Sequence, residues 1–230
     1  MMRMSLKMID RKTSQLSAKI SSYPDKRMAN LAKRGFDIIA ASVLLLLSLP
    51  LMILTAAAIA LNGGSLFYYS DRVGANGISF KCIKFQTMIP DADHCLDEYL
   101  VHHPRARDQW LQDRKLAFDP RVTSVGRLLR QSSLDELPQL INVIRGEMSL
   151  VGPRPVTRSE LDLYYCSGAE FYKSMRPGIT GLWQVSGRND VSYATRVALD
   201  ERYVREWNFI LDILILCRTP RVVLSKRGAR

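Results

Sequence analysis

The run IIAASVLLLLSLPLMILTAAAIAL, residues 38–61, decides the class of fold to which this chain belongs. Its 24 residues include no charged side chain, and the only polar or helix-breaking interruptions are Ser42, Ser48, Pro50 and Thr55. As a helix the run would extend over about 36 Å, which is enough to cross the hydrocarbon core of a bilayer. A buried core helix of a soluble domain is the alternative, but apolar runs of this length are uncommon there. The sequence therefore predicts one membrane-inserted helix.

The residues before this apolar run and the proline near its centre determine which membrane topologies are possible. Residues 1–35 carry nine basic side chains against two acidic ones, so the positive-inside rule places the N-terminus in the cytoplasm. A straight span would then export residues 62–230. Pro50 lacks the backbone donor of a helix interior and favours a kink, so a re-entrant helix that enters and leaves by the same face competes with the straight span. A signal peptide cleaved near residues 56–58 is a third alternative, although the stretch before its apolar region is too long.

Composition limits the partners of the chain. With 33 Lys and Arg against 22 Asp and Glu, its formal charge is +11, which favours anionic partners such as phosphate-bearing substrates or acidic lipid. The four cysteines lie far apart without a C-x-x-C pair, so a metal framework is not expected and a reduced, cytosol-facing domain is favoured. Neither a helix-turn-helix pattern nor interleaved basic and aromatic residues occur, so nucleic acid is not an expected partner.

Beyond the apolar run, the pattern predicts a small β element followed by short helices. Strand-forming residues flank Asn76-Gly77, which is a strong hairpin signal. Residues 91–115 are expected to be helical with a break near Pro104. A last helix is expected over residues 200–217, and its apolar side is expected to pack on the core rather than lie at a membrane interface.

The pair Asp135-Glu136 is the strongest candidate for chemistry, because the sequence has no Ser-His-Asp set and no P-loop. A capping box from Ser133 to Glu136, with no catalytic role, is one explanation of the pair. The other explanation is catalytic: a helix N-terminus lowers the pKa of a carboxylate and binds phosphate, which would keep Asp135 ionised and nucleophilic.

Several arginines could serve a phosphorylated ligand. Arg130 lies five residues before Asp135 and offers a planar fork for phosphate oxygens. Three loops rich in Gly and Pro add Arg154, Arg176 and Arg188. Each loop alone is a turn with a solvated arginine, but three in one small basic domain favour a phosphorylated ligand.

Four stretches closely resemble the bacterial sugar transferases, the monotopic polyprenyl-phosphate hexose-1-phosphate transferases. They are DRVGANGISFKCIKFQTM (71–88), LRQSSLDELPQLINVIRGEMSLVGPRP (129–155), RPGITGLWQVSGRNDVSYATR (176–196) and YVREWNFILDILIL (203–216). The likeness runs from about Lys33 to the end of the chain, in the family's order. It implies transfer of hexose 1-phosphate from a UDP-hexose to undecaprenyl phosphate with release of UMP, as the first step of exopolysaccharide repeat-unit synthesis. Galactose is the hexose that the resemblance favours, although no residue pattern decides between galactose and glucose.

The resemblance also implies roles for individual residues. Asp135 would be the nucleophile, Glu136 would help to hold Mg²⁺ as the cofactor, and Arg130 would belong to the same catalytic motif. The family's PRP element, near the nucleotide, falls on Pro153, Arg154 and Pro155. Further candidates for substrate binding in the resembling stretches are Lys84, Arg176, Gln184 and Arg188.

Two departures from the family pattern stand out. The family's usual KFRTM reads KFQTM here, so Gln86 replaces an arginine whose role is lost or moved. The break in the membrane helix reads Ser48-Leu49-Pro50, where many members have Ser and Pro adjacent, which leaves the position of the hinge open.

The predicted fold class is α+β and mainly α-helical, in three parts. A basic flexible arm is expected at residues 1–33, a re-entrant membrane helix at 34–62, and a cytosolic catalytic domain with interfacial helices at 63–230. The expected partners are UDP-hexose, undecaprenyl phosphate and anionic membrane lipid at the cytoplasmic face of the bacterial inner membrane, and the oligomeric state, a homo-oligomer included, is left open. The rival functions are a membrane-tethered basic protein without catalysis and a processed secreted protein.

Overall fold

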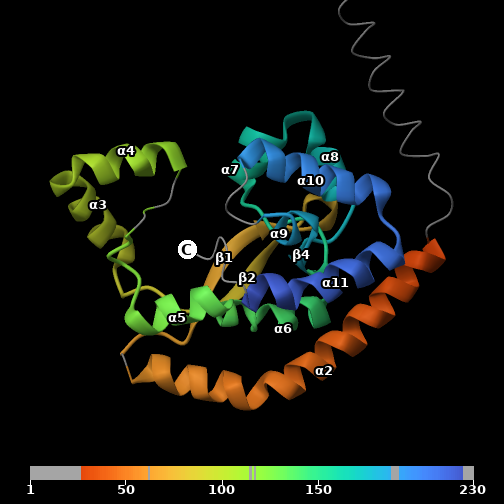
Figure 1. The fold of residues 1–230 in the computed structure, drawn as a ribbon, viewed down its shortest axis with the longest axis horizontal. Helices are drawn as coiled ribbons and strands as arrows, with labels where there is room; N and C mark the ends of the chain where they lie inside the picture. Colours follow the sequence, from red (N-terminus) through yellow and green to blue (C-terminus); the bar gives the residue numbers. More distant parts are fainter. Residues whose placement is uncertain (1–26, 62, 114–115, 117, 188–191, 225–230) are drawn as a thin grey trace, which may run out of the picture. The chain divides into compact units, whose positions relative to one another are not determined.

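Residues 27–61, 63–113, 116, 118–187 and 192–224 are described in the computed structural model shown in Figure 1. The chain divides into two units, residues 1–36 and 37–230. Residues 1–26 of the arm predicted at residues 1–33 lie outside the described residues. The role of the arm and the predicted boundaries of the three parts of the chain therefore stay predictions.

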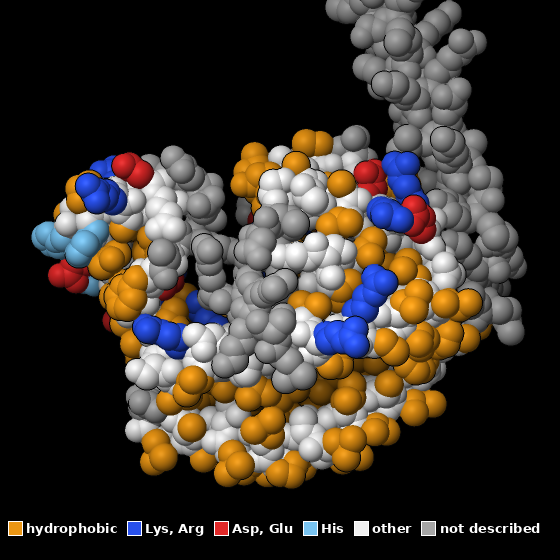
Figure 2. Space-filling view, in the orientation of Figure 1, with side chains coloured by type: hydrophobic (Ala, Val, Ile, Leu, Met, Phe, Trp, Pro, Cys, Tyr) orange, Lys and Arg blue, Asp and Glu red, His pale blue; other side chains and the backbone are white. Residues whose placement is uncertain are grey.

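The apolar run forms most of helix α2 (Arg27–Ala60), which contains Pro50 and does not run straight in Figure 1. Among the described residues, it is the one helix long and apolar enough to cross a membrane. Leu46, Leu47 and Leu54 on this helix remain 70%, 75% and 68% exposed. Figure 2 shows apolar side chains gathered along it. A core helix of a soluble domain would bury such a row, so the structure favours association of α2 with lipid.

The opposite side of α2 packs on the rest of residues 37–230. Met52 and Ile59 form a buried cluster with Phe85 and Leu129. Nearer the start of the unit, the buried carboxylate of Asp37 accepts hydrogen bonds from Ser149 Oγ at 2.8 Å and Leu150 N at 3.1 Å. α2 therefore contributes to the core of residues 37–230 along one side.

The predicted hairpin is confirmed. Strands β1 (Phe67–Val73) and β2 (Ser79–Phe85) pair antiparallel, with Val73 opposite Ser79 and Phe67 opposite Phe85. Asn76 and Gly77 in the connecting turn η1 (Ala75–Gly77) have positive φ angles of 57° and 76°, and Ile78 N donates to Ala75 O at 3.2 Å. This is the backbone that a type I′ turn requires and that Asn-Gly adopts easily.

Short helices, turns and a second strand pair make up the remaining described residues. In chain order these are α3 (Ala92–His102), α4 (Pro104–Asp113), α5 (Ser124–Ser132), η2 (Leu134–Glu136), α6 (Gln139–Arg145), β3 (Ser149–Val151), α7 (Arg158–Glu160), η3 (Leu161–Tyr165), η4 (Cys166–Gly168), α8 (Ala169–Lys173), β4 (Gly178–Thr180), α9 (Leu182–Val185), α10 (Tyr193–Glu206) and α11 (Phe209–Leu224). The break predicted near Pro104 is confirmed, because α4 begins there.

The single helix expected over residues 200–217 is wrong. The chain leaves helical geometry at Trp207, with φ −55° and ψ 130°, and this separates α10 from α11. The buried carboxylate of Asp212 ties the two helices, since it accepts from Tyr203 Oη at 2.6 Å and Trp207 Nε1 at 3.1 Å. Ile210 is 71% exposed, so the apolar side of this stretch is only partly packed on the core.

The parallel pair of β3 and β4 was not expected from the sequence. Ser149 lies opposite Gly178 and Val151 opposite Thr180. A Cβ atom on Gly178 would lie 2.0 Å from Gly152 N, so only glycine permits this approach. The pairing brings the loops GPRP and RPG into contact, although they are more than twenty residues apart in the chain.

Candidate active site

The turn that carries Asp135 and Glu136 lies between α5 and α6. α5 ends at Ser132, and Ser133 takes a left-handed conformation with φ 58° and ψ 18°. The side chain of Ser133 makes no cap hydrogen bond to the 3₁₀ turn η2 that follows, so the capping box considered for Ser133 and Glu136 is not formed. Asp135 also precedes α6, which begins at Gln139. The pair therefore stands on a tight turn of its own.

The β hairpin supplies the cation beside this turn. Lys84 Nζ donates to Glu136 Oε1 at 2.6 Å, with both side chains about one-third exposed (28% and 35%). Burial alone would lower the pKa of Lys84, but the carboxylates of Glu136 and Asp135 outweigh it and raise this pKa above its usual value. Lys84 therefore stays charged next to the two acids.

The Asp135 carboxylate is more buried than expected for an acid at a helix N-terminus. Burial first, and the Glu136 carboxylate second, raise the pKa of Asp135 to about 6, while Lys84 and Arg130 act against them. The expectation that a helix N-terminus would lower this pKa is wrong, because desolvation dominates. At neutral pH the carboxylate is still ionised, and its raised basicity favours nucleophilic attack.

Arg130 is held in place by the segment that follows strand β2. Its Nε donates to Thr87 Oγ1 at 2.9 Å, and Thr87 is itself buried. Burial lowers the pKa of Arg130, which nevertheless remains a cation at any physiological pH. The close approach of α5 to this segment depends on Gly126, since a Cβ atom there would lie 2.1 Å from Thr87 O.

A cavity of about 750 Å³ opens above these residues. One face of the hairpin forms part of its wall, because side chains two residues apart on a strand point to the same side. The hairpin residues on this face are Tyr68, Ser70, Arg72, Cys82, Lys84 and Gln86. Asp135, Glu136 and Arg130 line the same cavity. Its size suits a nucleotide-sugar rather than a small ion.

The structure brings together most of the predicted site residues. Arg154, Pro155 and Gln184 line the cavity with Asp135 and Glu136. Pro153 is buried and is not among the lining residues; its carbonyl accepts from Gly178 N at 2.8 Å. Gln86, the residue that departs from the family pattern, also lines the cavity.

One predicted residue among those described, Arg176, lies away from the cavity. Arg176 is exposed and is not among the cavity-lining residues; its Nε donates to Gly146 O at 2.7 Å. The structure therefore does not bring Arg176 to the cavity, because the RPG loop presents Gly178 there instead, and the role of Arg176 in substrate binding stays a prediction. Arg188 lies outside the described residues.

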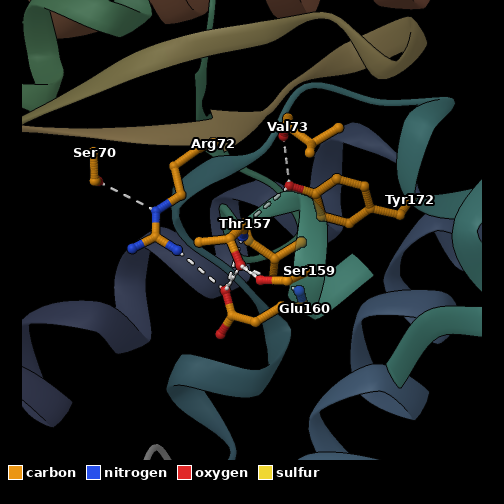
Figure 3. A network of polar contacts seen from close by, with 8 residues as sticks. Ser70, Arg72, Val73, Thr157, Ser159, Glu160 and Tyr172 are labelled. Carbon is orange, nitrogen blue, oxygen red and sulfur yellow. Dashed lines mark hydrogen bonds and ion pairs between the residues drawn. The ribbon is translucent and has the colours of Figure 1, made fainter. Parts of the chain in front are cut away.

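Sequence reasoning missed several residues of the cavity wall, among them Arg72, Arg121 and Trp183. Figure 3 shows Arg72 reaching from β1 toward α7, where its Nη1 lies 3.1 Å from Glu160 Oε2. Hydrogen bonds from Thr157 N and Oγ1 hold the same carboxylate. Tyr68, Ser70 and Arg72 alternate along strand β1 and therefore share one face of the hairpin, the face on which Lys84 lies. This alternation was the sequence signal that could have placed Arg72 in the cavity wall.

The acidic turn and the apolar helix share one hydrophobic cluster. Leu134 and Leu137, which flank Asp135 and Glu136, pack against the buried cluster of Met52 and Ile59 of α2 with Phe85 and Leu129. The turn η2 is therefore linked through this cluster to a helix whose other side is apolar and exposed.

The carboxylates provide a limited donor set for a metal. Among the described residues no group of three or more His, Cys, Asp and Glu side chains is placed to hold an ion. Mg²⁺ commonly takes only one or two carboxylates and completes its octahedron with waters and substrate phosphates. Two adjacent acids, one with a raised pKa, fit an ion bound in that way, because a cation would relieve their repulsion.

A family model described as bacterial sugar transferase matches residues 28–226. The chain therefore belongs to the bacterial sugar transferase family, and the resemblance seen in the sequence is confirmed. The exopolysaccharide production protein ExoY of Rhizobium meliloti is 55% identical over 203 residues, which are 88% of this chain and 89% of that protein. The undecaprenyl-phosphate galactose phosphotransferase of Salmonella typhimurium is 48% identical over 89% of this chain, which matches 43% of its length. The UDP-glucose:undecaprenyl-phosphate glucose-1-phosphate transferase of Caulobacter vibrioides is 38% identical over 87% of this chain and 72% of its own length.

Proposed function

We propose that the protein transfers hexose 1-phosphate from a UDP-hexose to undecaprenyl phosphate and releases UMP, as the first step of exopolysaccharide repeat-unit synthesis. The main observation that supports the proposal is the buried Asp135 carboxylate, which lines a cavity together with Lys84 and Arg130, on a turn whose flanking leucines pack against the same hydrophobic cluster as α2. Galactose is the proposed hexose, because the Salmonella relative named for galactose is more similar than the Caulobacter relative named for glucose.

In the first half-reaction, Asp135 attacks the phosphorus that carries the hexose. A bond forms between a carboxylate oxygen and this phosphorus while the bond to the UMP oxygen breaks, and UMP leaves with the electron pair. The phospho-hexose remains on Asp135 as an acyl phosphate. Arg130 and Lys84 offset the charge that builds on the phosphoryl oxygens, and no proton needs to be moved.

In the second half-reaction, a phosphate oxygen of undecaprenyl phosphate attacks the same phosphorus. The acyl bond to Asp135 breaks, which regenerates the carboxylate and yields the lipid diphosphate-linked hexose. Dividing the transfer in this way lets a soluble nucleotide and a membrane-bound lipid use one cavity in turn. The hydrophobic cluster that Leu134 and Leu137 share with Met52 and Ile59 of α2 supports a site close to the lipid surface.

Mg²⁺ is the proposed cofactor, with Glu136 as the protein side chain that helps to hold it. Bound there, the ion would offset the charge of the diphosphate and stabilise the leaving UMP. Lys84 pairs with Glu136 and is positioned to keep that carboxylate oriented.

For topology, we propose that α2 is re-entrant and that the site faces the cytoplasm at the inner membrane of a bacterium, where the UDP-hexose is made. Pro50 within α2 and the bend of that helix in Figure 1 support a helix that does not cross the bilayer straight.

The decisive experiment measures UMP release from UDP-galactose and UDP-glucose, with and without undecaprenyl phosphate. Asp135→Asn should fold normally yet lose nearly all activity, since the amide is no nucleophile. Asp135→Glu should lose about a hundredfold, because one methylene moves the attacking oxygen by about an ångström. Asp97→Asn, an exposed acid on α3 outside the cavity, is the matched control and should keep its activity. An active Asp135→Asn variant would refute the covalent mechanism.

A further inference from the structure

Arg72 is a cation of the cavity wall whose guanidinium group is oriented by two neighbours. Its Nε donates to Ser70 Oγ at 3.3 Å, and its Nη1 donates to Glu160 Oε2 at 3.1 Å. Among the described residues nothing accepts from its third nitrogen, Nη2, which carries no dashed line in Figure 3. The side chain is 20% exposed and lines the cavity that contains Asp135. Arg72 therefore has an oriented N–H group left for a ligand.

Ser70 adds a second donor on the same face of the strand. It lies two residues before Arg72 and also lines the cavity. Because Ser70 Oγ accepts from Arg72, its own hydrogen is left for another acceptor, and none of the described residues supplies one. A ligand at this point must therefore offer acceptor atoms. The ionised oxygens of a phosphate only accept hydrogen bonds, and they are the oxygens that a guanidinium group binds best.

The charges around Arg72 leave this part of the wall positive. Its partner Glu160 already accepts hydrogen bonds from Thr157 N and Oγ1. Burial raises the pKa of Glu160, but the hydrogen bonds from Thr157 and the cations Arg72 and Arg154 outweigh it and lower this pKa. Two guanidinium groups therefore act on one carboxylate, and Arg154 lines the same cavity. An anionic ligand would balance the excess positive charge.

Arg72 shares its wall with the cation that pairs with the acidic turn. In the hairpin Tyr68 lies opposite Lys84, and Arg72 is four residues further along β1, so the Cα atoms of Tyr68 and Arg72 lie about 13 Å apart. Cys82 lies between the two ends. Burial raises the pKa of the Cys82 thiol, and the charges of Lys84 and Arg72 both act against this rise. Both cations therefore act on the middle of this face, which suits a ligand with two adjacent phosphates.

We propose that Arg72, together with Ser70, binds the second phosphate of the nucleotide-sugar, which leaves with UMP. The inference rests on the proposed function, in which the sugar-linked phosphate lies beside Asp135, Lys84 and Arg130. The one other anionic group of a UDP-hexose is the phosphate next to it. Contact with Arg72 offsets the negative charge that the departing UMP takes up. The phosphate of undecaprenyl phosphate has the same chemistry, so the test separates the two sources.

The first measurement is the affinity of the purified full chain in detergent for UMP and UDP-galactose by calorimetry, with uridine measured by competition against UMP. An Asp135→Asn background prevents turnover. Arg72→Met removes the charge and the N–H groups, and it should weaken UMP binding by about tenfold or more. Arg72→Lys keeps the charge without the planar fork, and Ser70→Ala removes the hydroxyl, so each should cost about threefold. Uridine, which has no phosphate, should bind equally well to all of them.

Lys81→Met is the matched control. Lys81 lies on the same hairpin and pairs with Asp71 on the opposite face, where the two side chains are 64% and 70% exposed. The substitution removes the same charge as Arg72→Met without touching the cavity, so UMP affinity should not change. An equal loss in Lys81→Met would show a general effect of net charge and overturn the inference. If Arg72→Met does not fold because Glu160 loses its partner, Arg72→Lys and Ser70→Ala decide.

The second measurement uses chains with an intact Asp135 and varies undecaprenyl phosphate. The KM for this acceptor should stay the same in Arg72→Lys and Ser70→Ala. A raised KM for the acceptor with unchanged UMP affinity would assign the subsite to the lipid phosphate and overturn the inference.

The binding data contain three further outcomes against the inference. Unchanged UMP affinity in the Arg72 and Ser70 variants would show that the Arg72 Nη2 is only solvated. Equal losses for UMP and uridine would place Arg72 at the ribose or the base, and a loss confined to UDP-galactose would place it at the hexose or the sugar-linked phosphate. An Asp135→Asn parent that binds neither UMP nor UDP-galactose would instead contradict the proposed function itself.

Discussion

At the scale of single residues, the carboxylate of Asp135 sets the pH dependence of the proposed reaction. Burial and the Glu136 carboxylate raise its pKa to about 6, and only its ionised form can attack phosphorus. We expect kcat/KM to rise through about pH 6 and to level off above it. Lys84→Met should move the midpoint of this rise to higher pH, because Lys84 lowers the pKa of Asp135, and Glu136→Gln should move it lower.

The same pKa has a consequence for stability. Because the folded-state pKa of Asp135 is raised, its protonated form stabilises the fold at low pH, and this contribution is lost as the pH rises through about 6. Asp135→Asn should therefore melt at a higher temperature than the wild type at pH 7 and show no such gain at pH 4. Equal melting temperatures at both pH values would show that Asp135 is not buried as described.

A second property at the residue scale is the proposed role of Glu136 in holding Mg²⁺, from which we predict that activity requires this ion. A diphosphate beside Asp135 and Glu136 brings several negative charges together, so UMP release should stop in excess EDTA and return when Mg²⁺ is added. Full turnover in EDTA would leave Lys84 and the arginines to neutralise the charge alone and would contradict the proposed cofactor.

At the scale of elements, the contact between the GPRP and RPG loops shapes the part of the cavity wall that Arg154, Pro155 and Gly178 form. Gly178→Ala would place a Cβ atom 2.0 Å from Gly152 N, so the strands β3 and β4 would have to separate. We expect a loss of about 3 kcal/mol in the free energy of unfolding, together with weaker UMP binding, since Arg154 and Pro155 would move. Gly64→Ala, where no atom lies within 4 Å, is the control and should change neither.

At the scale of the whole molecule, the topology of α2 decides whether the site and its soluble substrate share a compartment. With a re-entrant helix, single cysteines placed near residues 10 and 225 should both resist an impermeant reagent in intact cells and both react after lysis. Cys166 and Cys217 are exposed and need to be replaced first, with the other native cysteines. Labelling of the residue-225 probe alone in intact cells would show a straight span and would contradict the cytoplasmic site.

The sequence by itself determined the features that depend on neighbouring residues. An uncharged run of 24 residues is long enough for a membrane helix in any context, and Asn76-Gly77 favours one turn geometry because both residues tolerate positive φ. The Asp135-Glu136 pair and the family resemblance could also be recognised from the sequence, since both depend only on the order of residues along the chain.

Only the tertiary structure decided what depends on residues far apart in the chain. Lys84 pairs with Glu136, which lies 52 positions further along the chain. Strands β3 and β4 pair through close contacts between glycines, and no sequence pattern predicted this pairing. Arg154 and Arg176 stand in similar Gly/Pro loops, yet one lines the cavity and the other bonds to Gly146. The pKa of Asp135 also depends on residues far apart in the chain. Burial and the charges of all neighbouring side chains together raise this pKa, and only the fold brings those neighbours around the carboxylate.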